Sequence, residues 1–377
     1  MITGSDYELL KEECETVYGM EAYRKCEDKK SILCIIPNLS MNGAQTVLCE
    51  LLDVIRTVGD YRFCFISPED GEYRDIYAAD GSMVCIRSQI VVSDKMRRLL
   101  QYSFDAVILN TALVHGYSMY FVNTKTPVLW WIHESEEHLK ACCYDMPNPN
   151  LLSSNFRIYG VTELVQNSFR TLYQYDIPVM HMSIKDQRDD YKRRLKENEK
   201  VIFVIPGAFT PIKGQDILLQ AIADIPREYQ DRSKFIFCGY EVEGSEEYYQ
   251  RIMEIGSRLD CVKNAGQLDR REMYQLYKDC DCVIAPSRID PTPTTIVEAM
   301  MFGKLTIASV NCGITQYMQD CVNGFVFDGV DELKKRLLLI INDLEAVKHV
   351  GEQGRDIWEK QFSPAYMRNL IMSKFKI

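Results

Sequence analysis

Two carboxylates bracket the junction of a short apolar run with a helix-like pattern in the C-terminal half of the chain. Asp290 precedes this junction, and Glu298 follows after seven intervening residues, one turn inside the helix pattern. Two prolines between them supply no N–H group, so the free backbone amides of Thr292, Thr294, Thr295 and Ile296 are expected to cluster at the helix start. The positive end of the helix dipole there favours an anion such as phosphate. The spacing therefore predicts an anionic ligand held by amides, with the two carboxylates binding its hydroxyl groups.

This stretch resembles the signature of the family-four retaining glycosyltransferases. In that signature Pro-Ser is followed after a few residues by Glu, seven further residues, Glu-Ala-Met and a Gly. Here Pro286 and Ser287 lead to Asp290. After seven residues Glu298 begins Glu-Ala-Met, and Gly303 follows. Only the first acid departs from the pattern, with Asp in place of Glu.

The resemblance implies a role for each position. Asp290 would lie against the donor sugar, the amides of Thr294 and Thr295 would hold the diphosphate, and Glu298 would bind the ribose hydroxyls. A plainer interpretation remains open, because Thr295 to Glu298 also fits a Ser/Thr-x-x-Glu capping box, and Asp-Pro is an ordinary turn opener.

A second loop carries a cation. Lys213 lies just before a predicted helix start, where a positive charge is disfavoured unless an anion is also present. Residues 209–219 resemble the family's Arg-x4-Lys-Gly loop, in which Arg and Lys grip the donor diphosphate. Lys213 matches, whereas Ala208 stands where the Arg is expected. Either another Arg replaces the missing one, or activity is low. A further alternative is that Lys213 is an exposed lysine without a function.

The N-terminal half offers two further candidates. The turn Asn42-Gly-Ala-Gln45 resembles the family's Gly-Gly-Ala-Glu turn, so Gly43 would let the backbone approach a ligand; a plain helix-start glycine is the alternative. His133 follows the apolar run 128–132, at the carboxyl end of a predicted strand. It resembles the family histidine that touches the donor sugar near the reaction centre, although an isolated histidine is more often structural.

Gly266 and Gln267 are candidates for the nucleobase site. They close a short stretch, 262–268, that resembles the family strand whose end holds the base through backbone groups; a turn glycine before a helix is the alternative. The cysteines show no Cys-x-x-Cys spacing, so no metal site is predicted. No cofactor is expected beyond the nucleotide sugar, which would be the donor substrate.

The alternation of strands and helices predicts two doubly wound Rossmann-like α/β domains. A length of 377 residues fits two domains better than one core. We expect a helical extension at 1–30, an acceptor-side domain at 31–185, a nucleotide-sugar-binding domain at 199–360 and a C-terminal helix at 361–377. The charged run 185–198 is a linker or surface helix. The resemblance implies the GT-B architecture, with the domains facing across a cleft and the last helix crossing back.

Composition limits the classes of partner. The net charge of −10 argues against nucleic acid as the main partner. No apolar run approaches the roughly 20 residues that span a bilayer, and the N-terminus lacks an apolar signal core, so a cytoplasmic location is expected. Many cysteines lie in strand-like runs, as reduced thiols do. Basic residues of 185–198, with Lys95, Arg97 and Arg98, suggest peripheral contact with the inner membrane surface.

These features predict a glycosyltransferase that moves a sugar from a nucleotide-diphosphate sugar to a hydroxyl acceptor. Retention, independence of metal, and an acceptor such as a glycan or lipid-linked saccharide in surface polysaccharide synthesis are implied by the resemblance alone. The main alternative is a degenerate GT-B scaffold that binds a glycan or partner without chemistry. An epimerase of the same architecture would need an acid and a base poised on the sugar, and the sequence shows no second convincing histidine or carboxylate.

Overall fold

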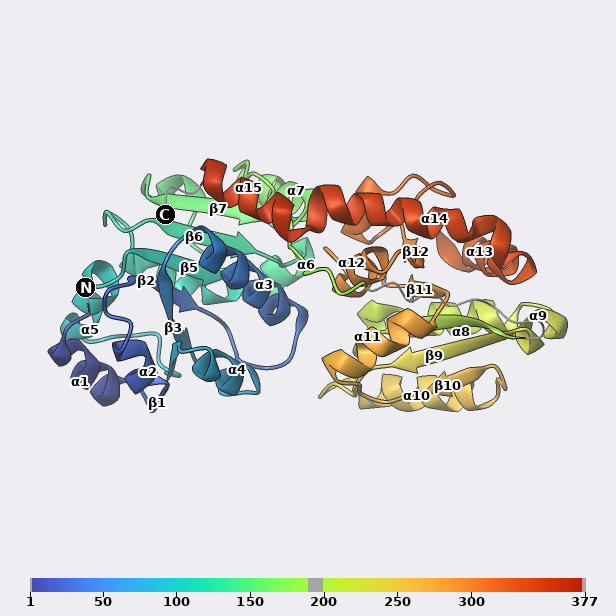
Figure 1. Cartoon of the computed structure of the whole chain (residues 1–377), viewed down its shortest axis with the longest axis horizontal. Helices are drawn as coiled ribbons and strands as arrows, with labels where there is room; N and C mark the ends of the chain where they lie inside the picture. The colour runs from blue at the N-terminus through green and yellow to red at the C-terminus, as the bar shows by residue number, and fades with distance from the viewer. Residues whose placement is uncertain (1, 189–198, 375–377) are drawn as a thin grey trace. The chain divides into compact units, whose positions relative to one another are not determined.

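The computed structural model describes residues 2–188 and 199–374 of the chain. Its contacts divide the described residues into two compact units (Figure 1). Unit one takes its residues from Met1–Ser183 and Pro364–Ile377, and unit two from Ile184–Ser363. Much of the charged run predicted as a linker, 189–198, lies outside the described residues.

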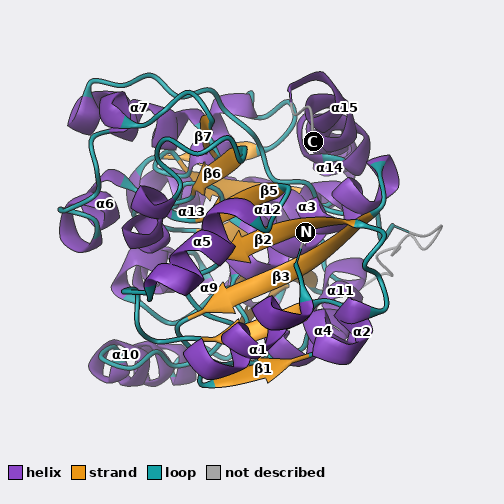
Figure 2. Cartoon of the chain, turned by 90° about the vertical axis from the view of Figure 1, so that its left-hand side faces the viewer, coloured by secondary structure: helices purple, strands orange, loops and turns teal. Residues whose placement is uncertain are grey.

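Unit one is built on a seven-stranded sheet with the order β1-β4-β3-β2-β5-β6-β7. All neighbouring strands are parallel except β1, which pairs antiparallel with β4. Figure 2 shows these strands as one twisted sheet with helices around it. The elements are α1 (Gly4–Glu13), β1 (Thr16–Tyr18), α2 (Met20–Arg24), β2 (Lys30–Ile35), α3 (Gly43–Val58), β3 (Tyr61–Ser67), α4 (Tyr73–Ala79), β4 (Met83–Ile86), α5 (Asp94–Tyr102), β5 (Ala106–Asn110), the 3-10 helix η1 (Ala112–Tyr120), β6 (Val128–Ile132), α6 (Glu136–Cys142), η2 (Pro149–Leu151), β7 (Phe156–Gly160), α7 (Glu163–Tyr173) and α15 (Pro364–Lys374).

The first 30 residues differ from the predicted helical extension. The strand β1 interrupts them and adds an antiparallel edge to the sheet through Thr16–Tyr18. Tyr7, Leu10 and Tyr23 are fully buried, so this segment belongs to the core of unit one. Helices α1 and α2 lie in this segment as expected, but β1 was not predicted, because a three-residue edge strand leaves no alternating pattern long enough to recognise.

The strand β7 was also missed. Its sequence, Phe-Arg-Ile-Tyr-Gly, is short, and the exposed Arg157 interrupts the apolar run. Strands β2, β3, β4, β5 and β6 are mostly apolar runs, as is typical of strands that are buried on both faces of a parallel sheet.

Unit two is built on a six-stranded sheet with the order β10-β9-β8-β11-β12-β13. Every neighbouring pair in it is parallel. The elements are β8 (Val201–Pro206), η3 (Pro211–Lys213), α8 (Gln215–Ala223), α9 (Arg227–Asp231), β9 (Ser233–Cys238), α10 (Glu246–Ser257), β10 (Val262–Asn264), α11 (Arg270–Asp279), β11 (Cys282–Ala285), α12 (Thr294–Met301), β12 (Leu305–Ser309), η4 (Gly313–Tyr317), β13 (Phe325–Phe327), α13 (Gly329–Asn342), α14 (Leu344–Ile357) and the π-helical turn η5 (Trp358–Phe362).

Strand order reverses once in each sheet, between β2 and β5 in unit one and between β8 and β11 in unit two. In both units the strands on either side of this point are parallel, which makes each a doubly wound, Rossmann-like sheet. The predicted fold class is therefore confirmed. Ligands of such sheets bind outside the carboxyl ends of the strands at the point of reversal.

The last helix belongs to unit one. Helix α15, red in Figure 1, packs against α3, and its side chains Met367 and Ile371 are buried. The predicted return of the C-terminal helix to the first domain is confirmed. Residues Trp358–Phe362 extend α14 within unit two, so the returning helix begins at Pro364. Among the described residues, no helix combines the length and apolar character needed to cross a membrane.

Candidate functional site

The point of strand reversal in unit two is flanked by two loops. One follows β8 and leads to Gly214, and the other follows β11 and leads to α12. Gly214 has a positive φ of 67°, and a Cβ atom there would lie 2.1 Å from the carbonyl oxygen of Pro286. Only glycine allows this approach without strain. The two loops are therefore held together at the edge where a ligand of this fold binds.

Lys213 and Asp290 meet at this edge. The Nζ atom of Lys213 donates to Oδ2 of Asp290 at 2.6 Å. The side chain of Lys213 is 37% exposed and that of Asp290 is 8% exposed. The carboxylate of Asp290 raises the pKa of Lys213, although burial opposes this shift. Lys213 is thus a charged group at neutral pH, as its predicted role requires.

Asp290 is fixed by its backbone as well as by its ion pair. Its N–H donates to the carbonyl oxygen of Asn311 at 3.2 Å, and its own carbonyl oxygen accepts from the N–H of Gly313 at 2.8 Å. These bonds tie the loop after β11 to the loop after β12. The position of the carboxylate is therefore set by two neighbouring strand ends.

The start of α12 matches the prediction at Thr294 and Thr295 but not at Ile296. Within the described part of the chain, the N–H groups of Thr294 and Thr295 have no hydrogen-bond acceptor, and no side chain caps the helix. The N–H of Ile296 donates to the carbonyl oxygen of Pro293 at 3.0 Å, so its predicted availability was wrong. The capping-box alternative is also wrong, because Pro293 rather than Thr295 precedes the first helical residue.

Glu298 lies one turn inside α12 and is partly buried. The hydroxyl of Tyr277, from α11, donates to its Oε2 atom at 3.0 Å. Burial, together with the adjacent carboxylate, raises the pKa of Tyr277 well above its usual range, which keeps the phenol protonated and able to donate. Tyr277 therefore orients the carboxylate that the resemblance assigns to the ribose. The sequence did not indicate this partner.

Arg288 is the residue that sequence reasoning missed beside the Lys213 loop. Its guanidinium donates to the carbonyl oxygen of Pro211 at 2.6 Å and to both carboxylate oxygens of Asp216 at 2.9 and 2.8 Å. Its backbone N–H also donates to the carbonyl oxygen of Ile212. Arg288 thus brings a second cation to the turn η3, near the loop in which Ala208 lacks one. The adjacent Pro-Ser pair stood in the recognised motif, but no local pattern identified Asp216 as the partner of Arg288.

Gly266 and Gln267 follow β10 in the same unit. Gly266 has a φ of 70°, and the space around its Cα is open, because a Cβ atom there would have no neighbour within 4 Å. Its carbonyl oxygen accepts from the N–H of Gly239, which follows β9. Gln267 is exposed. Both residues therefore lie at the carboxyl edge of the sheet, and their contact with a nucleobase stays a prediction.

The remaining two candidates lie in unit one. His133 follows β6, as predicted, and burial lowers its pKa to about 3, so the imidazole is neutral at physiological pH. Its Nε2 atom is buried without a hydrogen-bond partner among the described residues, and its backbone N–H donates to Oε2 of Glu134. Gly43 is the first residue of α3, behind Asn42, whose side chain accepts from the N–H of Gln45. Both His133 and Gly43 belong to unit one.

Family models match both units. The model described as glycosyl-transferase family 4 matches residues 28–146. The model described as glycosyl transferases group 1 matches residues 186–357, which hold Lys213, Asp290 and α12.

Among curated relatives, an uncharacterized glycosyltransferase of Methanocaldococcus jannaschii is 29% identical over 161 residues, which are 42% of this chain and 42% of that protein. The lipopolysaccharide 1,2-N-acetylglucosaminetransferase of Salmonella typhimurium is 26% identical over 175 residues, or 41% and 45% of the two chains. The matched part of this chain thus spans less than half the length of these relatives.

A solved structure of HepE from Anabaena in complex with UDP-glucose has the same fold. It superposes with a TM-score of 0.75 at 18% identity, covering 91% of this chain and 98% of that one. At this level of identity the likeness concerns the fold.

Proposed function

The chain belongs to the family-four glycosyltransferases, and we propose that it transfers a sugar from a nucleotide-diphosphate sugar to a hydroxyl group of an acceptor, with retention at the anomeric carbon. One observation carries this proposal. The ion pair of Lys213 with Asp290 lies at the carboxyl edge where strand order reverses. Asp290 is followed after three residues by Thr294 and Thr295, whose amides begin α12. A cation, two available amides and a carboxylate at one edge suit a diphosphate attached to a sugar.

Departure of the nucleoside diphosphate is the step that these groups assist. Negative charge builds up on the leaving diphosphate, and preorganised donors aimed at that charge lower the barrier. Lys213 supplies a full positive charge, and the first turn of α12 supplies amides and the positive end of its dipole. Asp290 holds Lys213 in place before the donor arrives. Its carboxylate then accepts hydrogen bonds from the hydroxyl groups of the sugar.

Retention requires either a carboxylate nucleophile or attack by the acceptor on the face from which the diphosphate leaves. We propose that the reaction proceeds without a bound metal ion, because Lys213 and the α12 amides supply the charge stabilisation that a metal gives elsewhere. Undiminished turnover in the presence of EDTA, together with NMR assignment of the anomeric configuration of the product, tests both statements. Loss of turnover in EDTA or an inverted product would refute the corresponding one.

The acceptor we propose is a glycan or a lipid-linked saccharide in surface polysaccharide synthesis. Support comes from one relative, the lipopolysaccharide 1,2-N-acetylglucosaminetransferase. A cytoplasmic location is proposed on the cysteines, since Cys34, Cys64, Cys85, Cys238 and Cys282 are buried thiols in strands, as in reducing compartments.

We also propose peripheral contact of the protein with an anionic membrane surface. Lys95 and Arg98 line a groove between α5 and α1 that also holds the acidic side chains Asp6, Glu8 and Glu12, so the basic surface there is partly neutralised. Sedimentation with liposomes that contain acidic lipids tests the contact. If the protein stays in the supernatant at low salt, this part of the proposal is withdrawn.

The central test replaces Lys213. We expect Lys213→Ala to lower the rate of donor turnover about 10²- to 10³-fold, as the loss of one charge-stabilising donor does elsewhere. A panel of UDP-, GDP- and dTDP-sugars, hydrolysed without acceptor, first identifies the donor and then supplies the assay. Lys334→Ala is the control, because Lys334 is also a partly exposed lysine paired with an aspartate, but on α13. Full turnover by Lys213→Ala would refute the role of this lysine.

The scaffold alternative remains because Ala208 replaces the expected Arg. Calorimetry with the corresponding nucleoside diphosphates separates the two functions. An enzyme of this kind binds one of them, and Lys213→Ala weakens that binding. A wild-type protein that binds none of them and hydrolyses no donor is a scaffold.

A further inference from the structure

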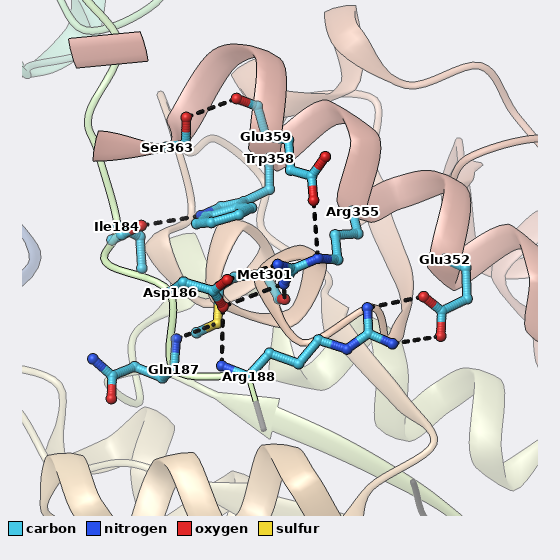
Figure 3. Close-up of polar contacts among 10 residues, drawn as sticks. All are labelled: Ile184, Asp186, Gln187, Arg188, Met301, Glu352, Arg355, Trp358, Glu359 and Ser363. Carbon is cyan, nitrogen blue, oxygen red and sulfur yellow. Dashed lines mark hydrogen bonds and ion pairs between the residues drawn. The ribbon is translucent and has the colours of Figure 1, made fainter. Parts of the chain in front are cut away.

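The C-terminal end of α12 is held by a guanidinium. Arg355, from α14, donates through Nη1 to the carbonyl oxygen of Met301, the last residue of α12. Its Nη2 atom donates to Oδ2 of Asp186 at 2.7 Å, and its Nε lies 3.3 Å from a carboxylate oxygen of Glu359 (Figure 3). A cation at this end of a helix is favoured by the helix dipole. The side chain of Arg355 is 16% exposed, whereas those of Asp186 and Glu359 are 44% and 55% exposed, so the guanidinium is the buried partner and solvent screens the carboxylates.

Asp186 belongs to the segment 184–188, with which the chain enters unit two. This segment lies along α14, η5 and the end of α12 (Figure 3). The N–H of Ile184 donates to the carbonyl oxygen of Phe362 at 2.8 Å, and its carbonyl oxygen accepts from Nε1 of Trp358 at 3.1 Å. The N–H of Gln187 lies 3.2 Å from the sulfur of Met301. The segment is thereby bound both to η5 and to α12.

A second ion pair closes the segment. Arg188 donates to both carboxylate oxygens of Glu352, at 2.9 and 2.7 Å (Figure 3). Glu352 lies next to Gly351 on α14, where a Cβ atom would be 2.6 Å from the carbonyl oxygen of Gly303. Helix α14 therefore approaches the turn after α12 at backbone distance, and no space is left for that end of α12 to shift toward it.

The opposite end of α12 is joined to α11 by the hydrogen bond from Tyr277 to Glu298, and no cation holds it among the described residues. No side chain caps its first turn, and this turn carries the amides of Thr294 and Thr295 that the proposed function assigns to the donor diphosphate. The helix has 8 residues, so its two ends are about 12 Å apart. Over so short a rigid element, a displacement at Met301 is carried directly to the amides at the other end.

We propose that Arg355, together with Asp186, is a positioning residue for the donor: it fixes the axial position of α12 and thereby the place of its N-terminal amides. The inference rests on the proposed function, because the amides matter only if an anionic donor binds them. Buried side chains such as Ile296, Val297 and Met300 hold α12 against the sheet. Apolar packing has no preferred direction. The hydrogen bonds of the Arg355 guanidinium are directional, and they fix Met301 relative to Asp186.

The test uses the full-length variants Arg355→Gln, Arg355→Lys and Asp186→Asn. We expect Arg355→Gln to lower kcat/KM for the donor about 10- to 100-fold, because a misplacement of about 1 Å has this effect. Most of the loss should fall on kcat, since the misplaced amides face the charge that grows as the diphosphate leaves. Arg355→Lys, which keeps the charge but not the fork, should recover only part of the loss.

A readout that needs no activity accompanies the kinetics. Hydrogen exchange followed by mass spectrometry should show faster exchange in peptides covering residues 294–301 of Arg355→Gln. Arg336→Gln is the matched control, because Arg336 also lies on a helix of unit two and donates to a carbonyl oxygen, that of Val326, and to an aspartate, Asp320. This control should change neither α12 exchange nor donor kinetics. Thermal unfolding of each variant shows whether the fold is retained.

The outcomes separate the inference from the proposed function. Unchanged exchange in α12 and unchanged donor kinetics in Arg355→Gln would overturn the positioning role while the wild type remains active. Effects of equal size in Arg336→Gln would also overturn it, since they would mark general destabilisation. A wild type that neither binds a nucleoside diphosphate nor hydrolyses a donor defeats the proposed function, and the role of Arg355 toward a donor falls with it, whatever the exchange shows.

Discussion

At the scale of single residues, the charges of the candidate site are held by neighbours of opposite charge. Lys213 lies against Asp290, and Arg288 lies against Asp216. A diphosphate that binds at this edge must therefore compete with a carboxylate for each cation. Before any ligand arrives, the two ion pairs hold the ammonium of Lys213 and the guanidinium of Arg288 in place at this edge.

The lowered pKa of His133 makes the stability of the fold depend on pH. Its pKa is about 3 in the folded chain and about 6.5 in an unfolded one. Below about pH 6.5 the imidazole of His133 binds a proton in the unfolded chain but not in the folded chain. The stability that neutral His133 allows is therefore complete above that pH and is lost as the pH falls toward the folded-state value.

We predict that His133→Gln flattens this loss. Between about pH 6 and pH 4.5 the free energy of unfolding of the wild type should fall more steeply than that of the variant, by at most about 1.4 kcal/mol per pH unit. Urea denaturation at several pH values measures both slopes. His349→Gln, which removes an exposed imidazole, is the control and should match the wild type. Equal slopes in all three proteins would show that His133 is not held neutral.

At the scale of elements, the site depends on loops that meet at backbone distance. The turn η3 ends at Gly214, against the carbonyl oxygen of Pro286, and Arg288 closes the same contact from the other loop. The candidate residues Lys213 and Asp290 lie in these loops and not in strands β8 and β11 themselves. The candidate residues therefore lie in the loop after each strand, where the functional residues of doubly wound sheets usually lie.

Gly214→Ala should expose this dependence. An alanine there has both an unfavourable φ of 67° and a Cβ atom 2.1 Å from the Pro286 oxygen. Gly244→Ala is the matched control, with a φ of 81° and nothing within 4 Å of the added atom. The control should lose only the about 1–2 kcal/mol of a left-handed non-glycine residue, measured by urea unfolding.

Gly214→Ala should lose more than Gly244→Ala, and its donor kinetics should also suffer, because Lys213 precedes the displaced residue. Equal losses of stability in the two variants would mean that the loops yield without cost. In that case the close approach of the loops does not fix Lys213.

At the scale of the whole molecule, the chain makes one unit from two separate segments. Unit two is continuous from Ile184 to Ser363, whereas unit one is completed by α15 at the far end of the chain. Synthesis of unit one is therefore finished only after unit two has been made. The two units should unfold in separable steps, since each has its own sheet and core.

Substitutions in α15 test this division. Met367 is fully buried and Met372 is 66% exposed, on the same helix. Met367→Ala should destabilise unit one by about 2–5 kcal/mol, and Met372→Ala should have little effect. Differential scanning calorimetry should show the transition of unit one shifted in the first variant and that of unit two unchanged. A shift confined to the unit-two transition would contradict the assignment of α15 to unit one.

The sequence by itself determined the two doubly wound units, the loop that carries Lys213, the strand end that carries His133, and the carboxylates around α12. These features are local: continuous apolar runs mark buried strands, and prolines and glycines mark the loops between elements. The strands β1 and β7 were not predicted, because they are short and carry exposed residues.

Only the tertiary structure decided which side chains meet. Arg288 and Asp216 are 72 residues apart, Tyr277 and Glu298 are 21 apart, and Arg355 and Asp186 are 169 apart. None of these pairs can be deduced from local spacing, because each depends on strand order and on how helices pack over the sheet. The partners that orient the candidate donor site are therefore set by the fold, while the candidate donor-binding groups themselves were already visible in the chain.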